Sequence, residues 1–265
     1  MLIWSIIRNN IQNRLLSFFK KIFKKEEKLP PYDLSLLNVD VHSHFIPGID
    51  DGAQTIDESL DLLRQMEEFG YKKVITTPHV MLDYYKNTPE IILSGLEKVK
   101  NAIQENGLQI EIEASAEYNL DLGFEEIIKE DKVLSFGGDN KYVLFELSFY
   151  NEPKRLKEVI WELNMKGFKP ILAHVERYAY WHKKWDKIED IVNRDVKLQV
   201  NIGSFTGVYG VEVKNTAQRL VDEGLVDLIG SDCHNMRHID MIKEAICLPY
   251  FHKACENPDL INKHL

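Results

Sequence analysis

The stretch Val39-Asp-Val-His-Ser-His-Phe-Ile-Pro-Gly-Ile-Asp-Asp-Gly-Ala53 carries the strongest structural signal in the chain. Its first residues alternate as in a β-strand, and Pro47-Gly48 ends the strand pattern. His42 and His44 are two positions apart, so on a strand both imidazoles would point to the same face. Imidazoles followed by carboxylates such as Asp51 form a set that zinc, manganese or iron binds. This stretch therefore predicts a metal site at the end of a strand.

The composition is that of an ordinary folded protein. The chain has 265 residues, of which 44% are hydrophobic and 28% charged, which is enough for one large core. A formal net charge of -9 argues against a nucleic-acid-binding protein. The 3 cysteines form neither a Cys-x-x-Cys pair nor an even set. This pattern indicates a reducing compartment, so we expect a cytoplasmic protein.

Residues 1–28 differ from the rest of the chain. They hold many lysines and arginines but only two glutamates, and their apolar residues recur at helical spacing. This pattern predicts a basic amphipathic helix, followed by a linker that ends at residue 30. No apolar run approaches the roughly 18 residues of a spanning helix. We expect the helix to lie on the inner face of the membrane, or to pack on its own domain or a second subunit; the sequence leaves these alternatives open.

Strand-like and helix-like segments alternate from residue 37 onward. The expected strands are short, apolar and rich in β-branched residues, as buried parallel strands are; they cover residues 37–42, 73–77, 109–114, 142–147, 170–174, 198–201 and 226–230. Helical patterns cover residues 55–69, 89–105, 153–166 and 213–223. This alternation predicts one α/β domain with a parallel sheet over residues 31–265.

Residues able to bind metal follow the expected strands. In α/β folds, chemistry collects at the carboxyl ends of the strands, and six of these strands end in or run into His, Asp or Glu. The candidate metal ligands are His42, His44, Asp51, His79, Glu117, Glu146, His174, Asp232 and His234. This set exceeds the needs of one ion, so two or three ions are expected. Their charge would attract an anion such as phosphate.

Two arginines follow the candidate ligands closely. Arg177 comes three residues after His174, and Arg237 comes three residues after His234. A guanidinium group binds two phosphate oxygens at once and stays charged at any physiological pH. We therefore expect Arg177 and Arg237 to bind the substrate.

These motifs together resemble the polymerase-and-histidinol-phosphatase (PHP) superfamily. Within it, they are most similar to the bacterial metal-dependent tyrosine-protein phosphatases encoded with capsule and exopolysaccharide genes. The motifs run in order over residues 37–246: Asp40-x-His-x-His44, Asp50-Asp51-Gly52, Thr77-Pro-His79, Ala116-Glu117-Tyr118, Glu146, Ala173-His-Val-Glu-Arg177 and Ser231-Asp-Cys-His-Asn235. The resemblance implies a distorted (β/α)7 TIM-like barrel with three divalent metal ions.

The resemblance also implies how the ligands divide among the ions. His42, His44, Glu117 and Asp232 would hold the first ion, Glu117, Glu146 and His174 the second, and Asp51, His79 and His234 the third. Asp51, His79 and Arg177 would be the catalytic residues, with Arg177 gripping the phosphoryl group. Manganese is the expected metal, and iron and zinc are alternatives because mixed His and carboxylate sites accept all three.

The implied activity is hydrolysis of protein phosphotyrosine by a metal-activated hydroxide. The implied partner is the phosphorylated tyrosine kinase of a polysaccharide export system. None of the cysteines begins a Cys-x5-Arg motif, so a cysteine-based tyrosine phosphatase is excluded. The sequence leaves open a small-molecule phosphatase of the histidinol-phosphatase type, a metal amidohydrolase, and a non-catalytic scaffold that binds the kinase. Aromatic residues in the loops, among them Tyr85 and Phe149, are expected to flank a phosphotyrosine ring.

Overall fold

The computed structural model describes residues 28–265, so the helix expected over residues 1–28 lies outside the described residues except at its last position. The described chain begins as a linker that is fixed to the end of helix α8 (Met236–Ala245). The N–H of Leu29 donates to the carbonyl of Cys247, and the N–H of Tyr32 donates to that of Ile246, both at 2.8 Å. Between residues 28 and 265 no helix has the length and apolar character needed to cross a membrane.

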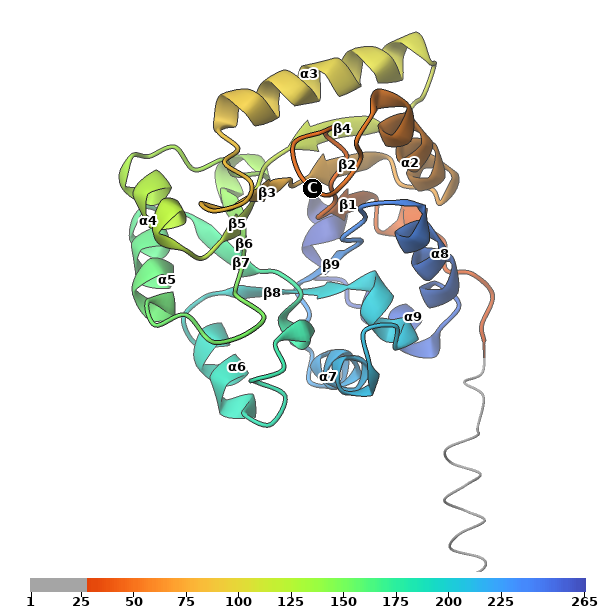
Figure 1. Cartoon of the computed structure of the whole chain (residues 1–265). Coiled ribbons are helices and arrows are strands. Elements are labelled where there is room, and N and C mark those ends of the chain that lie inside the picture. Colours follow the sequence, from red (N-terminus) through yellow and green to blue (C-terminus); the bar gives the residue numbers. More distant parts are fainter. Residues whose placement is uncertain (1–27) are drawn as a thin grey trace, which may run out of the picture.

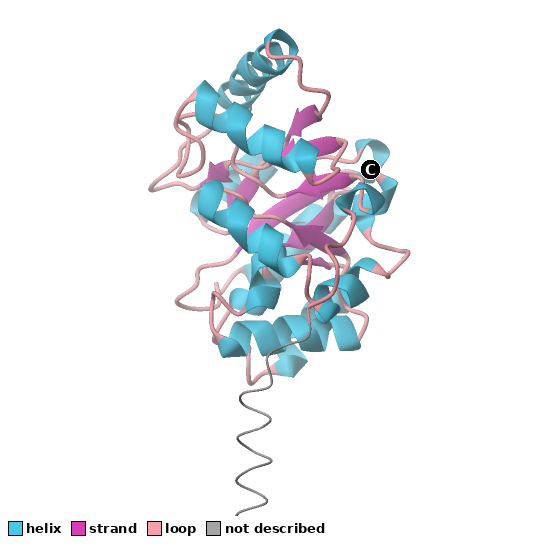
Figure 2. Cartoon of the chain, turned by 90° about the vertical axis from the view of Figure 1, so that its right-hand side faces the viewer, coloured by secondary structure: helices cyan, strands magenta, loops and turns pink. Residues whose placement is uncertain are grey.

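Parallel strands form two sheets at the centre of the molecule, and helices surround them (Figures 1 and 2). The first sheet has the order β1 (Val39–Val41), β2 (Lys73–Thr76), β4 (Glu111–Ala114). The second has the order β3 (His79–Val80), β5 (Glu117–Asn119), β6 (Tyr142–Glu146), β7 (Lys169–Leu172), β8 (Lys197–Asn201), β9 (Leu228–Gly230). The expected α/β fold with parallel strands is confirmed.

Two of the expected strands continue past a break. Strand β2 stops before Thr77-Pro78, and β3 resumes at His79; β4 stops before Ser115, and β5 resumes at Glu117. Proline has no N–H to donate to a neighbouring strand, so Pro78 interrupts the ladder. Each continuation carries a candidate metal ligand as its first residue, and these two residues pair in register, His79 with Glu117. The breaks thus bring two ligands side by side.

The helices cover the outside of the strands (Figure 2). The sequence predicted α2 (Ile56–Glu68), α3 (Pro89–Glu105), α5 (Leu156–Met165) and α7 (Val211–Asp222). It did not predict α4 (Leu122–Lys129), α6 (Trp185–Val192), α8 or α9 (Pro249–Cys255). The 8 residues of α4 and of α6 are too few to show a helical period clearly. Helix α2 begins as expected, with the Thr55 hydroxyl accepting from the N–H of Glu58.

The first and last strands lie side by side. Ser43 and Cys233 form a parallel bridge just beyond the ends of β1 and β9. The N–H of Asp232 donates to the carbonyl of His42 at 2.7 Å, and the N–H of His44 donates to that of Cys233 at 2.9 Å. Two motifs that lie far apart in the sequence therefore meet, each with a candidate ligand at the contact.

The space between the strands is apolar along the strands, as far as the residues that precede the candidate ligands. Buried side chains from several strands and the C-terminal segment fill it: Val39, Val41, Ile75, Phe136, Leu144, Ile171, Ala173, Leu228 and Ile261. Asn262 closes this end, because its amide accepts from the N–H of Ile229 (3.0 Å) and donates to the carbonyls of Val39 (2.9 Å) and Ile229 (2.8 Å). We call these nine apolar residues the strand-start core.

Candidate metal centre

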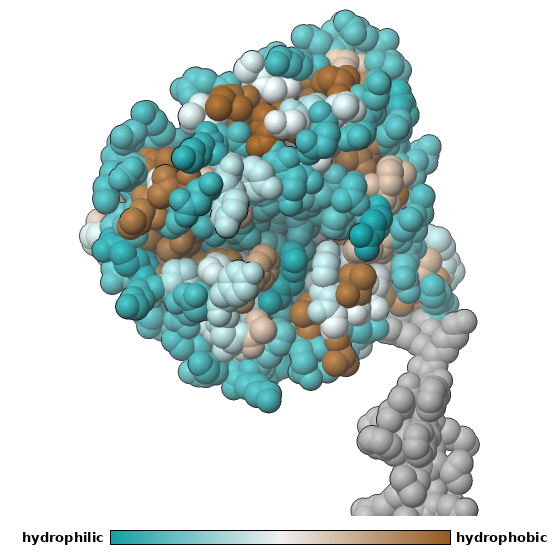
Figure 3. Space-filling view, in the orientation of Figure 1, coloured by the Kyte–Doolittle hydropathy of each residue, from teal (hydrophilic) through white to brown (hydrophobic). Residues whose placement is uncertain are grey.

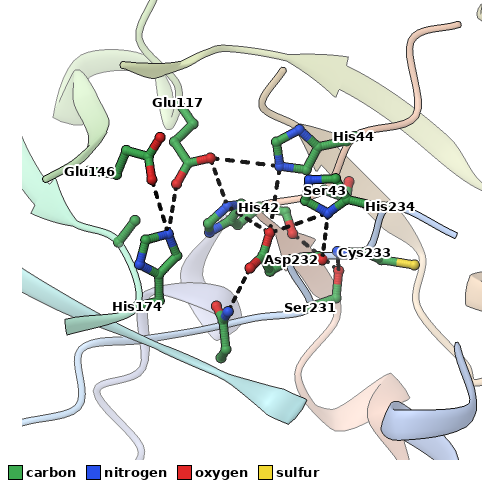
Figure 4. Close-up of polar contacts among 12 residues, drawn as sticks. His42, Ser43, His44, Glu117, Glu146, His174, Ser231, Asp232, Cys233 and His234 are labelled. Carbon is green, nitrogen blue, oxygen red and sulfur yellow. Dashed lines mark hydrogen bonds and ion pairs between the residues drawn. The ribbon is translucent and has the colours of Figure 1, made fainter. Parts of the chain in front are cut away.

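All nine candidate ligands lie together at the carboxyl ends of the strands, and Figure 4 shows seven of them. In the described part of the chain, four groups of them place ligand atoms within 4.8 Å of one another: His44, Asp51, His79 and His234; His42, His44 and Glu117; His42, His174 and Asp232; His79, Glu117 and Glu146. Shared members link the four groups. The structure thus brings together every residue that the sequence singled out as a metal ligand.

Glu117, the first residue of β5, lies at the middle of this set and is fully buried. Its Oε2 atom is 3.2 Å from His42 Nε2, 3.0 Å from His79 Nδ1 and 3.7 Å from His44 Nε2. Its Oε1 atom is 3.0 Å from His174 Nε2 (Figure 4). One carboxylate therefore faces four imidazoles, which is the arrangement of a ligand shared by more than one cation.

Asp232 faces the same space from the end of β9. Its Oδ1 atom is 3.3 Å from His42 Nε2, 3.6 Å from His44 Nε2 and 3.5 Å from His234 Nδ1. Its Oδ2 atom accepts hydrogen bonds from Asn201 Nδ2 (2.7 Å) and from the Arg177 guanidinium (3.0 Å). One oxygen is thus held by the protein and the other is left facing the imidazoles.

Asp51 lies at the entrance, where its side chain is 56% exposed. Its Oδ1 atom is 3.5 Å from His79 Nε2 and 3.4 Å from His234 Nε2. The adjacent Asp50 has a different task, because its Oδ2 atom is 2.7 Å from His44 Nδ1 and also accepts from the N–H of His79. Asp50 orients His44 from behind, as an outer carboxylate does for a metal-bound histidine.

Several buried polar atoms at this centre have no hydrogen-bond partner of suitable geometry. They are His42 Nε2, His44 Nε2, His79 Nδ1, Glu117 Oε2 and Glu146 Oε1. A buried polar group left unsatisfied costs about 1–3 kcal/mol, so five of them in one place would be destabilising. They face one another, and imidazole nitrogens and carboxylate oxygens are the donors that transition metals take. The residues present therefore fit bound divalent cations.

The pKa values show the same need for positive charge. Burial lowers the pKa of His42, but the carboxylates of Glu117 and Asp232 outweigh burial and raise it to about 9. Burial also opposes the shift of His79, whose pKa the neighbouring Glu117 raises to about 10. Burial, together with the nearby Glu117 carboxylate, raises the pKa of Glu146 to about 8. These three groups therefore keep their protons to a higher pH than usual, and bound metal ions would displace those protons.

A cavity of about 290 Å³ is lined by six of the candidate ligands and by Arg177. The guanidinium carbon of Arg177 lies 4.7 Å from the centre of the Phe149 ring and 4.6 Å from that of Tyr209. Cations are attracted to aromatic faces, so the two rings hold this guanidinium in place. Figure 3 shows the same face as Figure 1, which is mostly hydrophilic, with hydrophobic residues in separate small patches.

Among the other residues expected at the site, Arg237 lies outside the ligand cavity, whereas two of the loop aromatics lie at the site. Arg237 is exposed and lines a neighbouring cavity, of about 470 Å³, with Asp51 and Met236, so it does not join Arg177 in the ligand cavity. Among the loop aromatics, Phe149 lines the ligand cavity and Tyr85 stacks on His79 with ring centres 5.5 Å apart.

Sequence reasoning missed four residues of this region. Gln199 and Asn201, in β8, are fully buried and contact ligands through their amides. Tyr209 contacts Arg177, and His238 lines the cavity. A signal for the first two exists in the sequence: β8 is the one expected strand without a metal-type residue at its end, yet it ends in Gln-Val-Asn.

Comparison with known proteins assigns the chain to a family. A family model described as capsular polysaccharide synthesis, CpsB/CapC, matches residues 38–256. The chain belongs to the CpsB/CapC family. The match includes every candidate metal ligand as well as Arg177 and Arg237.

Individual members of the CpsB/CapC family are distant in sequence. The tyrosine-protein phosphatase YwqE of Bacillus subtilis is 27% identical over 75% of this chain and 78% of its own length. The tyrosine-protein phosphatase CpsB of Streptococcus pneumoniae is 25% identical over 75% of this chain and 83% of its own length. The fold also matches a crystal structure from work on YwqE of Bacillus subtilis and CpsB of Streptococcus pneumoniae, described as "unique metal-dependent tyrosine phosphatases". The TM-score is 0.73, and the sequences are 24% identical over 85% of this chain and 94% of the other.

Proposed function

We propose that this chain is a metal-dependent phosphatase that hydrolyses phosphotyrosine in proteins. One observation carries the proposal: nine ligand-type side chains lie together, and six of them line a cavity that Arg177 also lines. Asp51, Glu117, Glu146 and Asp232 supply four carboxyl groups, and bound cations would offset their charge and attract a phosphate monoester. The relatives YwqE and CpsB are named tyrosine-protein phosphatases, which supports the same substrate class here.

We propose three divalent ions, with manganese as the working metal and iron or zinc as alternatives. Bound ions would supply Lewis acidity toward a phosphoryl oxygen and a nucleophile at neutral pH. His42, His44, Glu117 and Asp232 would hold the first; Glu117, Glu146 and His174 the second; Asp51, His79 and His234 the third. Glu117 would bridge two of the ions.

The protein's own groups would bind and orient the substrate. Arg177, which bonds Asp232 Oδ2 through one nitrogen, would offer its other N–H groups to the phosphoryl oxygens and stabilise their charge in the transition state. Phe149 and Tyr209 would keep the guanidinium in position and exclude water from that side of the phosphoryl group. Asp51 and His79 would be catalytic as ligands of the third ion, on the side of the centre that supplies the nucleophile. We retain Arg237 only as a contact for parts of the substrate outside the ligand cavity.

We also propose that the two sheets form one distorted barrel of seven β/α units. The parallel strands would succeed one another as β1, β2 with β3, β4 with β5, β6, β7, β8 and β9. The Ser43–Cys233 bridge, which joins the ends of β9 and β1, supports closure of the ring. In such a barrel all the ligands would come from one rim, as the family resemblance implies.

The physiological substrate that we propose is the phosphorylated tyrosine kinase of a polysaccharide export system. The family description, capsular polysaccharide synthesis, supports this setting. Residues 1–28 would hold the enzyme at the inner face of the membrane, where such a kinase works, or would bind a protein surface. Co-sedimentation with anionic liposomes separates these alternatives, because equal pelleting of the full chain and of a chain starting at residue 28 would end the membrane proposal.

Phosphate release tests the proposed function. The full chain is stripped with a chelator, reloaded with Mn²⁺, Zn²⁺ or Fe²⁺, and given a phosphotyrosine peptide, a phosphoserine peptide or histidinol phosphate. We expect release from the phosphotyrosine peptide, and only after metal is returned. Release from histidinol phosphate alone would support the metal centre but would refute phosphotyrosine as the substrate. Absence of release with several ions bound per chain would refute the phosphatase and favour an amidohydrolase or a scaffold.

A further inference from the structure

We infer that Gln199 and Asn201 form a two-residue amide relay that positions His42, His174 and Asp232 as metal ligands. This inference rests on the metal centre of the proposed function and goes beyond it, because neither amide faces the cavity. Both residues belong to β8, two positions apart, and are fully buried. They contact three ligands that come from the ends of three different strands, β1, β7 and β9.

The hydrogen bonds of the relay have only one consistent direction. Gln199 Oε1 accepts from the backbone N–H of His174 at 2.7 Å, which can only donate, so Gln199 Nε2 must point the other way. There it donates to Asn201 Oδ1 at 2.7 Å. Asn201 Nδ2 then donates to the Asp232 carboxylate at 2.7 Å, which can only accept. A backbone donor at one end and a carboxylate at the other thus fix both amides.

This direction determines which atom of each ligand is free. His42 Nδ1 lies 3.1 Å from Gln199 Oε1, an acceptor, so Nδ1 carries the proton and Nε2 keeps its lone pair. That Nε2 atom is the one without a hydrogen-bond partner at the metal centre. In the same way, Asp232 Oδ2 is occupied by Asn201, and Oδ1 is left facing the imidazoles. The relay thus leaves one metal-binding atom free on His42 and one on Asp232.

The backbone of the three ligands explains why they need to be held. His42, His174 and Asp232 have φ values of 87°, 33° and 49°, in the left-handed region that non-glycine residues rarely adopt. Such a conformation persists only where its surroundings fix it. Two of these three residues bond to the relay through side chains and the third through its backbone N–H. Of the nine candidate ligands, these three are the ones with positive φ.

Space around the relay is also restricted. A Cβ atom added to Gly230 would lie 2.7 Å from Gln199 Nε2 and 3.0 Å from His42 Cβ, closer than real Cβ contacts. The strand next to the relay therefore has no side chain at this point, and the Gln199 amide occupies the room. An amide that is packed on one side and bonded on the other has a single position available.

Metal affinity of the full chain tests the relay. Gln199→Met keeps the size of the side chain and removes its hydrogen bonds, and Asn201→Leu does the same at the second position. The control is Asn262→Leu, which removes hydrogen bonds to the backbones of β1 and β9 at the strand-start core and touches no ligand. Zn²⁺ affinity is measured by competition with a chelating indicator, and thermal unfolding and circular dichroism report folding.

We expect each relay variant to lower Zn²⁺ affinity about 10- to 100-fold, the usual effect of losing an outer partner of a ligand. The double variant should lose little more than the worse single variant, because either substitution interrupts the same chain of bonds. The control should lower the unfolding temperature and leave Zn²⁺ affinity within about twofold, well below that range. In ¹⁵N spectra of Zn²⁺-loaded protein, His42 should show a protonated Nδ1 that is lost or shifted in Gln199→Met.

The inference is overturned if folded Gln199→Met and Asn201→Leu bind Zn²⁺ as the unaltered chain does. It is also overturned if their losses only match the loss of the Asn262→Leu control. If Gln199→Met does not fold, Asn201→Leu alone decides, because it breaks the link to Asp232 without touching the backbone of His174. Phosphotyrosine hydrolysis by the unaltered chain is measured separately, so failure of the phosphatase proposal and failure of the relay are distinguishable.

Discussion

The two ends of the space between the strands have opposite chemistry, although the same strands build both. The strand-start core, which extends along the strands as far as Val41 and Ala173, consists of apolar side chains. At the carboxyl ends, buried histidines and carboxylates face one another with unpartnered atoms. Strand β7 shows the change within a few residues, since Ile171 and Ala173 belong to the core and His174 to the metal centre. One end supplies stability without cations, and the other requires them.

The backbone makes this change possible over so short a distance. Successive side chains of an extended strand point to opposite faces, so neighbours such as Val41 and His42 should not both face inward. His42 leaves the extended conformation, with φ of 87°, and its imidazole joins the metal centre beside the core residue Val41. His174 does the same after Ala173, with φ of 33°. The comparison predicts that substitutions at the two ends will damage different properties.

The largest effect is expected at the middle of the metal centre. Glu117→Gln should lower phosphotyrosine hydrolysis about 10³-fold or more, because Lewis-acid stabilisation is worth several kcal/mol and each 1.4 kcal/mol is a factor of ten. Phosphate release and the metal content per chain are the measurements. The matched control is Glu125→Gln, a buried carboxylate in α4 that pairs with Arg155 and should leave activity unchanged. Full activity in Glu117→Gln would show that the metal centre does not take part in the reaction.

Loss of the arginine should separate metal binding from turnover. Arg177→Ala should lower the rate about 10²- to 10³-fold, as removing a group that stabilises transition-state charge does, and should leave the bound metal in place. Arg194→Ala is the control, because this arginine pairs with Asp190 on α6, outside the cavity. Rates from a phosphotyrosine peptide and metal analysis decide. An unchanged rate would exclude Arg177 from the mechanism.

A substitution in the strand-start core should have the opposite result. Leu228→Ala removes a fully buried side chain at the start of β9 and should lower the free energy of unfolding by about 2–5 kcal/mol. Zn²⁺ affinity and turnover of the folded variant should stay close to those of the unaltered chain. Chemical unfolding in the presence of chelator measures the first quantity. A loss of metal affinity as large as that of Gln199→Met would show that the two ends are not independent.

The smallest expected effect concerns the rings around the arginine. Phe149→Leu removes one of the two aromatic faces beside Arg177, a contact worth roughly 1 kcal/mol, or about a fivefold fall in kcat/KM. Metal content should not change. Tyr150→Leu is the control, since the neighbouring ring is 94% exposed. If both variants behave alike, the Phe149 ring does not hold the guanidinium.

Most of the fold and of the ligand set could be predicted from the sequence. Each ligand comes after or within a short apolar run, and parallel strands bring such positions to one rim. The position of Arg237 could not be predicted, because its distance from the cavity depends on how α8 leaves the metal centre. The sequence also predicted His42 on a strand, whereas β1 ends at Val41. The imidazoles converge because His42 has a left-handed backbone conformation, and the alternation of apolar and polar residues does not predict such a conformation.

The relay shows a further limit of sequence patterns. Glutamine and asparagine have no charge and are ordinary residues of polar surfaces, so the Gln-Val-Asn end of β8 does not by itself indicate a role for Gln199 and Asn201. Their importance depends on burial and on what lies at each end of their hydrogen bonds. Those ends, His174 and Asp232, are supplied by other strands. Only the assembled structure shows that two amides connect three ligands.

The linker at residues 29–32 fixes a short tether beside the catalytic face. Its hydrogen bonds to Ile246 and Cys247 fasten it to one end of α8, and the other end of that helix begins two residues after His234. The 10 residues of α8 span about 15 Å at 1.5 Å per residue. A surface that bound residues 1–27, as proposed above, would be connected through α8 to the residues beside the cavity. Tethering would then set the distance to substrate as well as its local concentration.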